Sequence, residues 1–283
     1  MRVITQPDHV QTWCFEQRCS GKRLALVPTM GFFHEGHLSL MRWARKRADL
    51  LMVSLFVNPT QFGPGEDLKR YPRAPERDAA LAEEVGVDVL FMPKAEVMFP
   101  EGHATWVEAP ALSRGLCAVR RPEHFRGVAT VVTKLFMLTI PAMAVFGEKD
   151  WQQLAVIRRI TSDLHFPVEI HGRPTVRESD GLAMSSRNVN LSDQERLQAP
   201  AIYRGLQHMA RLVEKGETDA TLLLAALSEL YAREVPLGRI DYLAVVDPDL
   251  LYPVEEVAGA VLVAVAMQFS CARLIDNILI SRK

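Results

Sequence analysis

Short apolar runs with β character alternate with helical segments over the first 172 residues, and this alternation is the strongest constraint on the fold. The expected strands cover residues 23–28, 50–58, 87–93, 142–147 and 167–172, and the expected helices cover residues 36–48, 75–86, 128–139 and 150–164. A series of strand, helix and strand predicts a parallel sheet with crossover helices. Helices on both faces of such a sheet account for strands that are apolar almost throughout.

The pattern changes near residue 176. Two helical stretches, at 193–214 and 218–234, are followed by apolar β runs at 239–247, 260–269 and 271–280. Helices followed by strands predict a small α+β domain. A chain of 283 residues is long enough for two domains. We therefore expect an α/β domain over residues 1–175 and an α+β domain over residues 176–283.

Composition and charge exclude several classes of protein. The net charge is −1, which argues against broad attraction to nucleic acid or to an anionic membrane. The start of the chain has no apolar core of signal-peptide length, and the run at 257–267 is too short to cross a bilayer. None of the four cysteines forms a C-x-x-C pair, so we expect reduced, mostly structural thiols in a cytoplasmic protein.

The stretch "LVPTMGFFHEGH" places His34 and His37 after an expected strand and a glycine-containing turn, where a helix begins. A zinc protease needs H-E-x-x-H, and the spacing of three with no evident third ligand disfavours zinc. A plain helix start with two partly exposed histidines explains the motif taken alone. Phosphate binding is the third interpretation, because helix N-termini offer free N–H groups and a positive dipole end to anions. The context of strand, turn and helix favours this interpretation.

Two amides follow the next strand. Asn58 and Gln61 fall just after the carboxyl end of a strand, where open α/β sheets bind ligands. Amide side chains are suited to recognising hydroxyl groups, since they both donate and accept hydrogen bonds. A proline-fixed loop with turn-forming amides explains this stretch equally well by itself. The loop over residues 62–75 is long, as functional loops often are.

The segment "VFGEKDWQQL" repeats the arrangement of strand, turn and helix. Gly147 permits close approach of backbone, Asp150 can cap a helix, and Lys149 can place a positive charge beside phosphate. Gln153 lies one helical turn after Asp150 and faces the same way. A surface pair of Lys149 and Asp150 is the alternative.

Hydroxyl and guanidinium donors gather in the loop "AMSSRN". Ser185, Ser186 and Arg187 suit phosphate oxygens, although such a cluster also occurs by chance. Arg126 in "HFRGVAT" has two interpretations: it binds near a carboxylate, or it is simply a charge at the start of a helix. The sequence contains no G-x-S-x-G, no P-loop and no G-x-G-x-x-G. Phosphate binding must therefore use the histidines and the helix N-terminus.

Taken in order, these segments closely resemble the pantothenate synthetase (pantoate–β-alanine ligase) family. The resemblance covers nearly the whole chain and rests on long motifs: "PTMGFFHEGH", "FVNPTQFGPGEDLKRYPR", "HFRGV", "FGEKDWQQL", "ESDGLAMSSRN" and "ARLIDN". Phe32 and Phe33 depart from the family, which usually has small and aliphatic residues there. The departure affects packing over the nucleotide rather than the histidines.

The resemblance implies a Rossmann-like catalytic domain, a smaller C-terminal lid domain, and a homodimer joined through the larger domains. It implies an ATP-dependent condensation of pantoate with β-alanine through pantoyl adenylate, with release of pyrophosphate and AMP. Mg²⁺ accompanies ATP, and no protein ligand of the metal is assigned. The loop at 62–75 and the small domain are candidates for closure over the site.

The resemblance also implies roles for individual residues. His34, His37, Lys149 and Arg187 are the expected catalytic residues, and His37 is the proton donor in the family. Gln61, Gln153, Met30 and Arg126 are expected at pantoate or β-alanine. The expected ATP contacts are Met30, Gly31, His34, Gly36, His37, Asn58, Gly147, Glu148, Lys149, Asp150, Val176, Met184, Ser185, Ser186 and Arg187.

Three alternatives stay open. A nucleotidyltransferase that stops after nucleotide transfer shares the histidine pair, but it does not need paired glutamines or an amine acceptor. A silent binding protein on the same fold would be favoured by loss of a phosphate-site residue, and none is lost. A tRNA-charging role is disfavoured by the near-neutral charge and the lack of an extension the size of an anticodon domain.

Overall fold

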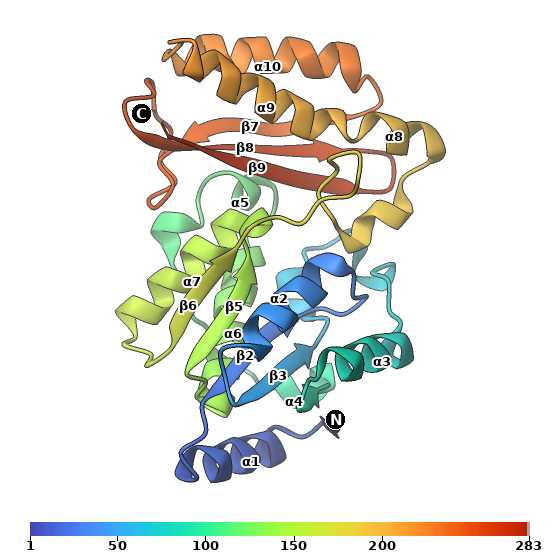
Figure 1. The fold of residues 1–283 in the computed structure, drawn as a ribbon, viewed down its shortest axis with the longest axis vertical. Helices are drawn as coiled ribbons and strands as arrows, with labels where there is room; N and C mark the ends of the chain where they lie inside the picture. Colours follow the sequence, from blue (N-terminus) through green and yellow to red (C-terminus); the bar gives the residue numbers. More distant parts are fainter. Residues whose placement is uncertain (282–283) are drawn as a thin grey trace.

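A computed structural model describes residues 1–281 and contains two sheets (Figure 1). The larger sheet has six strands in the order β1-β4-β3-β2-β5-β6, and every neighbouring pair is parallel. Its strands are β1 Arg2–Ile4, β2 Leu24–Thr29, β3 Leu50–Leu55, β4 Val89–Phe91, β5 Met143–Gly147 and β6 Glu169–Arg173. The predicted parallel sheet is confirmed.

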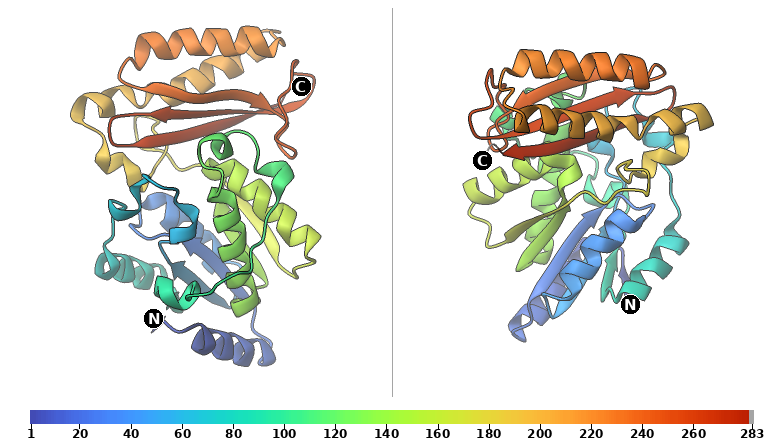
Figure 2. Two further views of the ribbon diagram at one scale, coloured as in Figure 1. Left: turned by 180° about the vertical axis from the view of Figure 1, so that it is seen from behind. Right: turned by 45° about the horizontal axis from the view of Figure 1, so that its top comes forward.

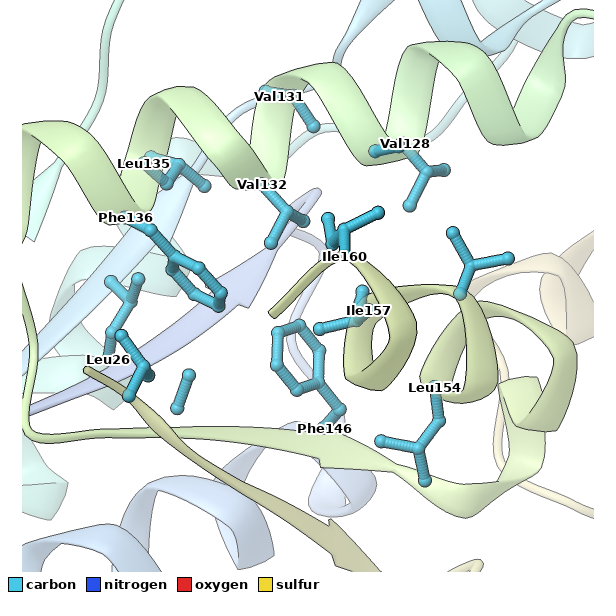
Figure 3. Packing of buried hydrophobic residues seen from close by; sticks show 14 of the residues in the cluster. Leu26, Val128, Val131, Val132, Leu135, Phe136, Phe146, Leu154, Ile157 and Ile160 are labelled. Carbon is cyan, nitrogen blue, oxygen red and sulfur yellow. The ribbon is translucent and has the colours of Figure 1, made fainter. Parts of the chain in front are cut away.

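Helices cover both faces of this sheet. The helices in this part of the chain are α1 Pro7–Cys19, α2 Glu35–Arg45, α3 Pro75–Val85, α4 Ala95–Met98, α5 Cys117–Arg120, α6 His124–Thr139 and α7 Trp151–Asp163. Successive strand residues point to opposite faces, so Val27 packs with the cluster around α2 and α3, whereas Leu26 packs with α6 and α7. Figure 3 shows the second cluster, in which Phe136 of α6 and Ile157 of α7 face Leu26 and Phe146.

The strand order reverses between β2 and β5. From β2 the chain moves outward to β3 and β4, and it then returns to place β5 on the other side of β2. In open α/β sheets, ligands bind beyond the carboxyl ends of the strands at such a reversal. The turns that follow β2 and β5 are the ones that carry the histidine motif and the Lys149 motif.

The smaller sheet is antiparallel, in the order β7-β8-β9. Its elements are α8 Asp193–Gln198, α9 Ala201–Glu214, α10 Ala220–Glu234, β7 Arg239–Val246, β8 Ala260–Gln268 and β9 Arg273–Ser281. Figures 1 and 2 show α9 and α10 on its outer side and the larger part of the molecule beneath it. Along β8, Val263 packs with α9 and α10, whereas Leu262 joins the core of the larger part.

Some predicted elements need correction. The helix expected over residues 193–214 is two helices, because Pro200 cannot donate the N–H that a continuous helix requires. Helix α6 begins at His124 rather than at residue 128. The strand β1 and the short helices α4 and α5 were not predicted. The domain boundary near residue 176 stays a prediction. Within residues 1–281, no helix is long and apolar enough to cross a membrane.

Candidate active site

The turn between β2 and α2 brings the histidine motif to the carboxyl edge of the sheet. Gly31 (φ 84°) and Phe32 (φ 53°) both have left-handed backbone. His34 is the N-cap of α2, and its Nδ1 accepts the backbone N–H of Gly36 at 3.1 Å. The His34 N–H points to Nδ1 of His37 at 3.4 Å. The two imidazole rings lie 4.1 Å apart between centroids.

Both histidines are neutral at pH 7. Burial, helped by the positive charge of Lys149, lowers the pKa of His34 to about 4. Burial also lowers the pKa of His37 well below its usual value, and His34 and Lys149 act in the same direction. Because each Nδ1 accepts a backbone N–H, the single ring proton belongs on Nε2. Each ring can therefore donate one hydrogen bond to a ligand without carrying a charge.

A cavity of about 210 Å³ opens beside the two rings. Residues from seven separate stretches of the chain line it. Among the residues singled out in the sequence, those in its wall are Met30, His34, Gly36, His37, Asn58, Gln61, Gly147, Lys149, Asp150, Gln153, Val176, Met184, Ser185, Ser186 and Arg187. The structure thus gathers residues that are up to 157 positions apart in the chain around one space.

Asn58 and Gln61 form one hydrogen-bonded unit in this wall. Asn58 is 1% exposed, and its Nδ2 donates to Gln61 Oε1 at 3.2 Å and to the Gly127 carbonyl at 3.1 Å. Its Oδ1 accepts the N–H and the hydroxyl of Thr60. A side chain on Gly127 would overlap the Thr60 carbonyl, so glycine is required for this approach. The Asn58 amide is fully used inside the protein, which favours a role in orienting Gln61 over direct contact with phosphate.

The smaller sheet holds the Lys149 turn in place. Asn277 on β9 donates from Nδ2 to the carbonyls of Glu148 and Lys149 at 3.0 and 2.9 Å. The indole N–H of Trp151 donates to the Pro248 carbonyl at 2.8 Å. Lys149 therefore reaches the cavity from a turn that both parts of the molecule fix.

Arg187 is held by a carboxylate from the loop at 62–75. Its Nε and Nη2 donate to Oδ2 and Oδ1 of Asp67 at 2.8 and 3.2 Å. Burial raises the pKa of Asp67, but the hydrogen bond and charge of Arg187 outweigh it and leave that pKa below its ordinary value. Ser186 Oγ donates to the Phe32 carbonyl at 3.3 Å, which joins this segment to the histidine turn.

Three predicted residues lie outside the cavity wall. Gly31 faces Leu55 and Asp78, and Glu148 contributes its carbonyl to Asn277. Arg126 pairs with Glu123 and stacks over Trp106 at 4.7 Å, so the structure does not bring it to the cavity. Its role at pantoate stays a prediction.

Sequence reasoning missed a second cavity of about 330 Å³ beside the first. Lys149, Asp150, Gln153, Ser185 and Arg187 line both spaces and form their common wall. The larger space extends to β7, β8 and β9 and also touches Arg121, which forms an ion pair with Glu66 at 2.6 Å. No sequence pattern could reveal it, because its walls come from both sheets.

An apolar wall of the smaller cavity was also missed. It is formed by Phe56, Val128, Val131, Val132, Leu135 and Phe146. The helical period of α6 predicts that its apolar face is buried, but that period is the same whether the face packs on core or lines a ligand site.

Within residues 1–281, no three His, Cys, Asp or Glu side chains come together as a metal site. Asp150 is the one carboxylate in the described wall of the smaller cavity. Mg²⁺ in nucleotide sites is commonly held by one or two carboxylates together with substrate phosphates. This donor set fits a cation that arrives with a nucleotide rather than one held by the protein alone.

Fold and site together define a Rossmann-like α/β protein with a polar cavity at the carboxyl edge of its sheet. The family model for pantoate-beta-alanine ligase matches residues 2–279, and the chain belongs to this family of ligases of pantothenate biosynthesis. The pantothenate synthetase of Oleidesulfovibrio alaskensis is 56% identical over 278 residues, which cover 98% of this chain and 99% of the relative.

Solved structures agree with this assignment. A pantothenate synthetase from Thermus thermophilus has a TM-score of 0.92 at 48% identity, covering 98% of this chain and 99% of that one. A pantoate-beta-alanine ligase from Francisella tularensis, solved with beta-gamma ATP and beta-alanine, has a TM-score of 0.80 at 28% identity, covering 99% and 97%. The predicted fold class and the predicted family are confirmed.

Proposed function

We propose that this protein condenses pantoate with β-alanine at the expense of ATP, through a pantoyl adenylate. The observation that carries the proposal is the grouping of two neutral histidines, a helix N-terminus, Lys149 and the Ser185–Arg187 segment around one cavity. Such a set suits the phosphates of ATP. The ATP-bound ligase from Francisella tularensis supports it as a relative of the same fold.

In the first step, a carboxylate oxygen of pantoate attacks the α-phosphorus of ATP, and the bond from that phosphorus to pyrophosphate breaks. Catalysis of such a transfer depends on positioning and electrostatics. His34 and His37 donate hydrogen bonds from Nε2 to phosphate oxygens, while Lys149 supplies positive charge. A neutral His37 favours this role over proton donation, because its low pKa leaves no imidazolium to donate from in the free protein.

The pantoate site is bounded by the amide pair and the apolar wall. Gln61 is 6% exposed and already oriented by Asn58, and Gln153 lines the same cavity. Their side-chain amides can form hydrogen bonds with the hydroxyl groups of pantoate. The valines of α6 suit its methyl groups, since burial of such groups is favourable.

In the second step, the amine of β-alanine attacks the acyl carbon, the bond from that carbon to the AMP oxygen breaks, and the amine loses a proton. The chain needs no nucleophile of its own, because the adenylate is the activated species. The larger cavity supports this step, since it adjoins the smaller one through Lys149, Asp150 and Gln153. A second substrate can thus reach the acyl carbon while the first occupies its pocket.

Three further properties are part of the proposal, and the family resemblance implies the first two. Mg²⁺ would be held mainly by the ATP phosphates, with Asp150 as the nearby carboxylate, and would neutralise phosphate charge. The protein would be a homodimer joined through residues 1–175, which light scattering tests. The four free thiols accord with a cytoplasmic location.

The proposal is tested by pyrophosphate release from Mg–ATP and pantoate, with and without β-alanine. We expect one turnover without β-alanine, and continuing release with AMP and pantothenate when it is present. Release that continues without β-alanine would indicate hydrolysis or simple nucleotide transfer. No release with any combination would favour a binding protein.

A further inference from the structure

Asp78 is a buried carboxylate that the proposed chemistry does not use. It lies on α3, is 1% exposed, and does not line the cavity beside the histidines. Its Oδ2 accepts the backbone N–H of Phe32 at 2.6 Å, and its Oδ1 accepts that of Phe33 at 2.7 Å. Both oxygens thus hold one turn that is more than 40 residues distant in the chain.

That turn needs an anion. Phe32 has φ of 53°, a conformation that costs energy for a bulky residue and that glycine adopts without strain. The turn aims two successive N–H groups at the same carboxylate, and concave pairs of N–H groups of this kind bind anions. The charge of Asp78 offsets the strain at Phe32. An asparagine in its place would accept one of the two backbone N–H groups with its oxygen and would set its own NH₂ group against the other.

The turn controls both halves of the site. Phe33 is followed by His34, whose backbone N–H and ring nitrogen take part in the hydrogen bonds that orient the two imidazoles. The carbonyl of Phe32 accepts from Ser186 Oγ at 3.3 Å, so the segment with Arg187 docks on the same turn. A shift of the turn would therefore move the histidines and release the serine together.

We propose that Asp78 is a positioning residue for the histidine pair, whose carboxylate holds the strained turn at Phe32 so that His34 and His37 face the ATP phosphates. The consequence for catalysis rests on the proposed function. The consequence for the ring positions does not, since it concerns the free protein alone.

The test compares Asp78→Asn with Asp88→Asn in the full chain. Asp88 serves as the control, because its carboxylate also accepts a backbone N–H, from Leu51 at 2.7 Å, but at the opposite end of the sheet, where it pairs with Arg45. We expect Asp78→Asn to lower the single-turnover rate of pyrophosphate formation by about 10–100-fold, the range for a small displacement of reacting groups. Asp88→Asn should keep the rate within about twofold, the small change expected where no catalytic group is displaced.

The ring ¹⁵N signals of His34 and His37, recorded without substrate, read the geometry directly. Asp78→Asn should shift them, and Asp88→Asn should not. Equal rate losses in the two variants, or a loss in Asp78→Asn with unmoved ring signals, would overturn the proposal. If the wild type forms no pyrophosphate from ATP and pantoate, the proposed function fails, and the ring signals still decide the role of Asp78.

A second variant tests the strain and covers a failure of Asp78→Asn to fold. Combining Asp78→Asn with Phe32→Gly removes the cost of the left-handed backbone. The double variant should fold and return the ring signals toward their wild-type positions, with partial recovery of the rate. If the double variant folds and its ring signals stay displaced as in Asp78→Asn, the mechanism is contradicted. Where Asp78→Asn alone does not fold, ring signals of the double variant that differ from those of the wild type contradict it equally.

Discussion

The two sides of the active site are held by different forces. His34 and His37 are fixed by backbone hydrogen bonds and burial at the end of β2. Arg187, in contrast, is fixed by an ion pair with Asp67 on a separate loop. In the proposed function, a phosphate would reach the histidines without displacing anything, whereas at Arg187 it would share the guanidinium with Asp67. The first side would therefore receive ATP with no competing charge, and the second would place two anions beside one guanidinium.

The largest effect is expected on the histidine side. His37→Ala should lower the single-turnover rate of pyrophosphate formation by about 10²–10³-fold, because it removes one preorganised donor at the developing charge. His37→Gln keeps a donor and should lose less. Rapid-quench measurement of pyrophosphate at saturating ATP checks both variants. An unchanged rate in His37→Ala would remove this residue from the chemistry.

Selective loss of one substrate is expected at the amide pair. Gln61→Ala should weaken pantoate binding by about 10-fold, the cost of roughly one or two hydrogen bonds. ATP affinity should be nearly unchanged, since Gln61 lies against Met30 and Asn58 rather than the helix N-terminus. Calorimetric titration of each ligand separates the two. A loss of ATP affinity with pantoate binding intact would contradict this placement.

A gain of affinity is expected on the ion-pair side. Asp67→Asn removes the charge that occupies Arg187, so ATP should bind about fivefold more tightly, corresponding to roughly 1 kcal/mol for a partly buried pair. Glu66→Gln is the control, because Glu66 pairs with Arg121 instead. Equilibrium binding of a non-hydrolysed ATP analogue measures both. Weaker binding in Asp67→Asn would show that Asp67 supports the ATP site rather than competing with it.

The smallest effect concerns stability in acid. The pKa of His34 falls from 6.5 to about 4 on folding because the ring is buried. Between these values the unfolded chain holds a proton that the folded chain does not, so stability rises with pH there and is lost as pH falls. His34→Asn keeps an N-cap residue and should lessen the drop in melting temperature between about pH 6.5 and 4. The exposed His9→Asn variant should retain the wild-type drop, and an equal drop in both variants would contradict the assignment.

The parallel sheet was predicted from local pattern, and the polar part of the cavity wall was predicted from local pattern together with the family resemblance. Strands of a parallel sheet end at a common edge, so polar motifs after β2 and β5 must meet there. The partners of Arg187 and of the Phe32 turn were not predictable, since nothing in local spacing decides that Asp67 and Asp78 will reach them. Likewise β1, with three residues, is too short to show a period.

Positions of single charges were the least predictable part of the site. Arg126 and Arg121 lie five residues apart, close to the start of α6. The pair of Arg126 with Glu123 is a local i,i+3 contact, whereas only tertiary contacts decide that Arg121 faces a cavity. Gln61 was found from its place after a strand, but its orientation by Asn58 depends on the approach of Gly127 from α6.

The adenylate is the central claim, and oxygen tracing tests it most directly. Pantoate labelled with ¹⁸O in its carboxylate would be turned over with Mg–ATP and β-alanine, and the AMP analysed by mass spectrometry. Attack on the α-phosphorus predicts one ¹⁸O in each AMP, because the bridging oxygen stays with phosphorus when the amine attacks carbon. Unlabelled AMP, with the label in inorganic phosphate or pyrophosphate, would contradict the proposed mechanism.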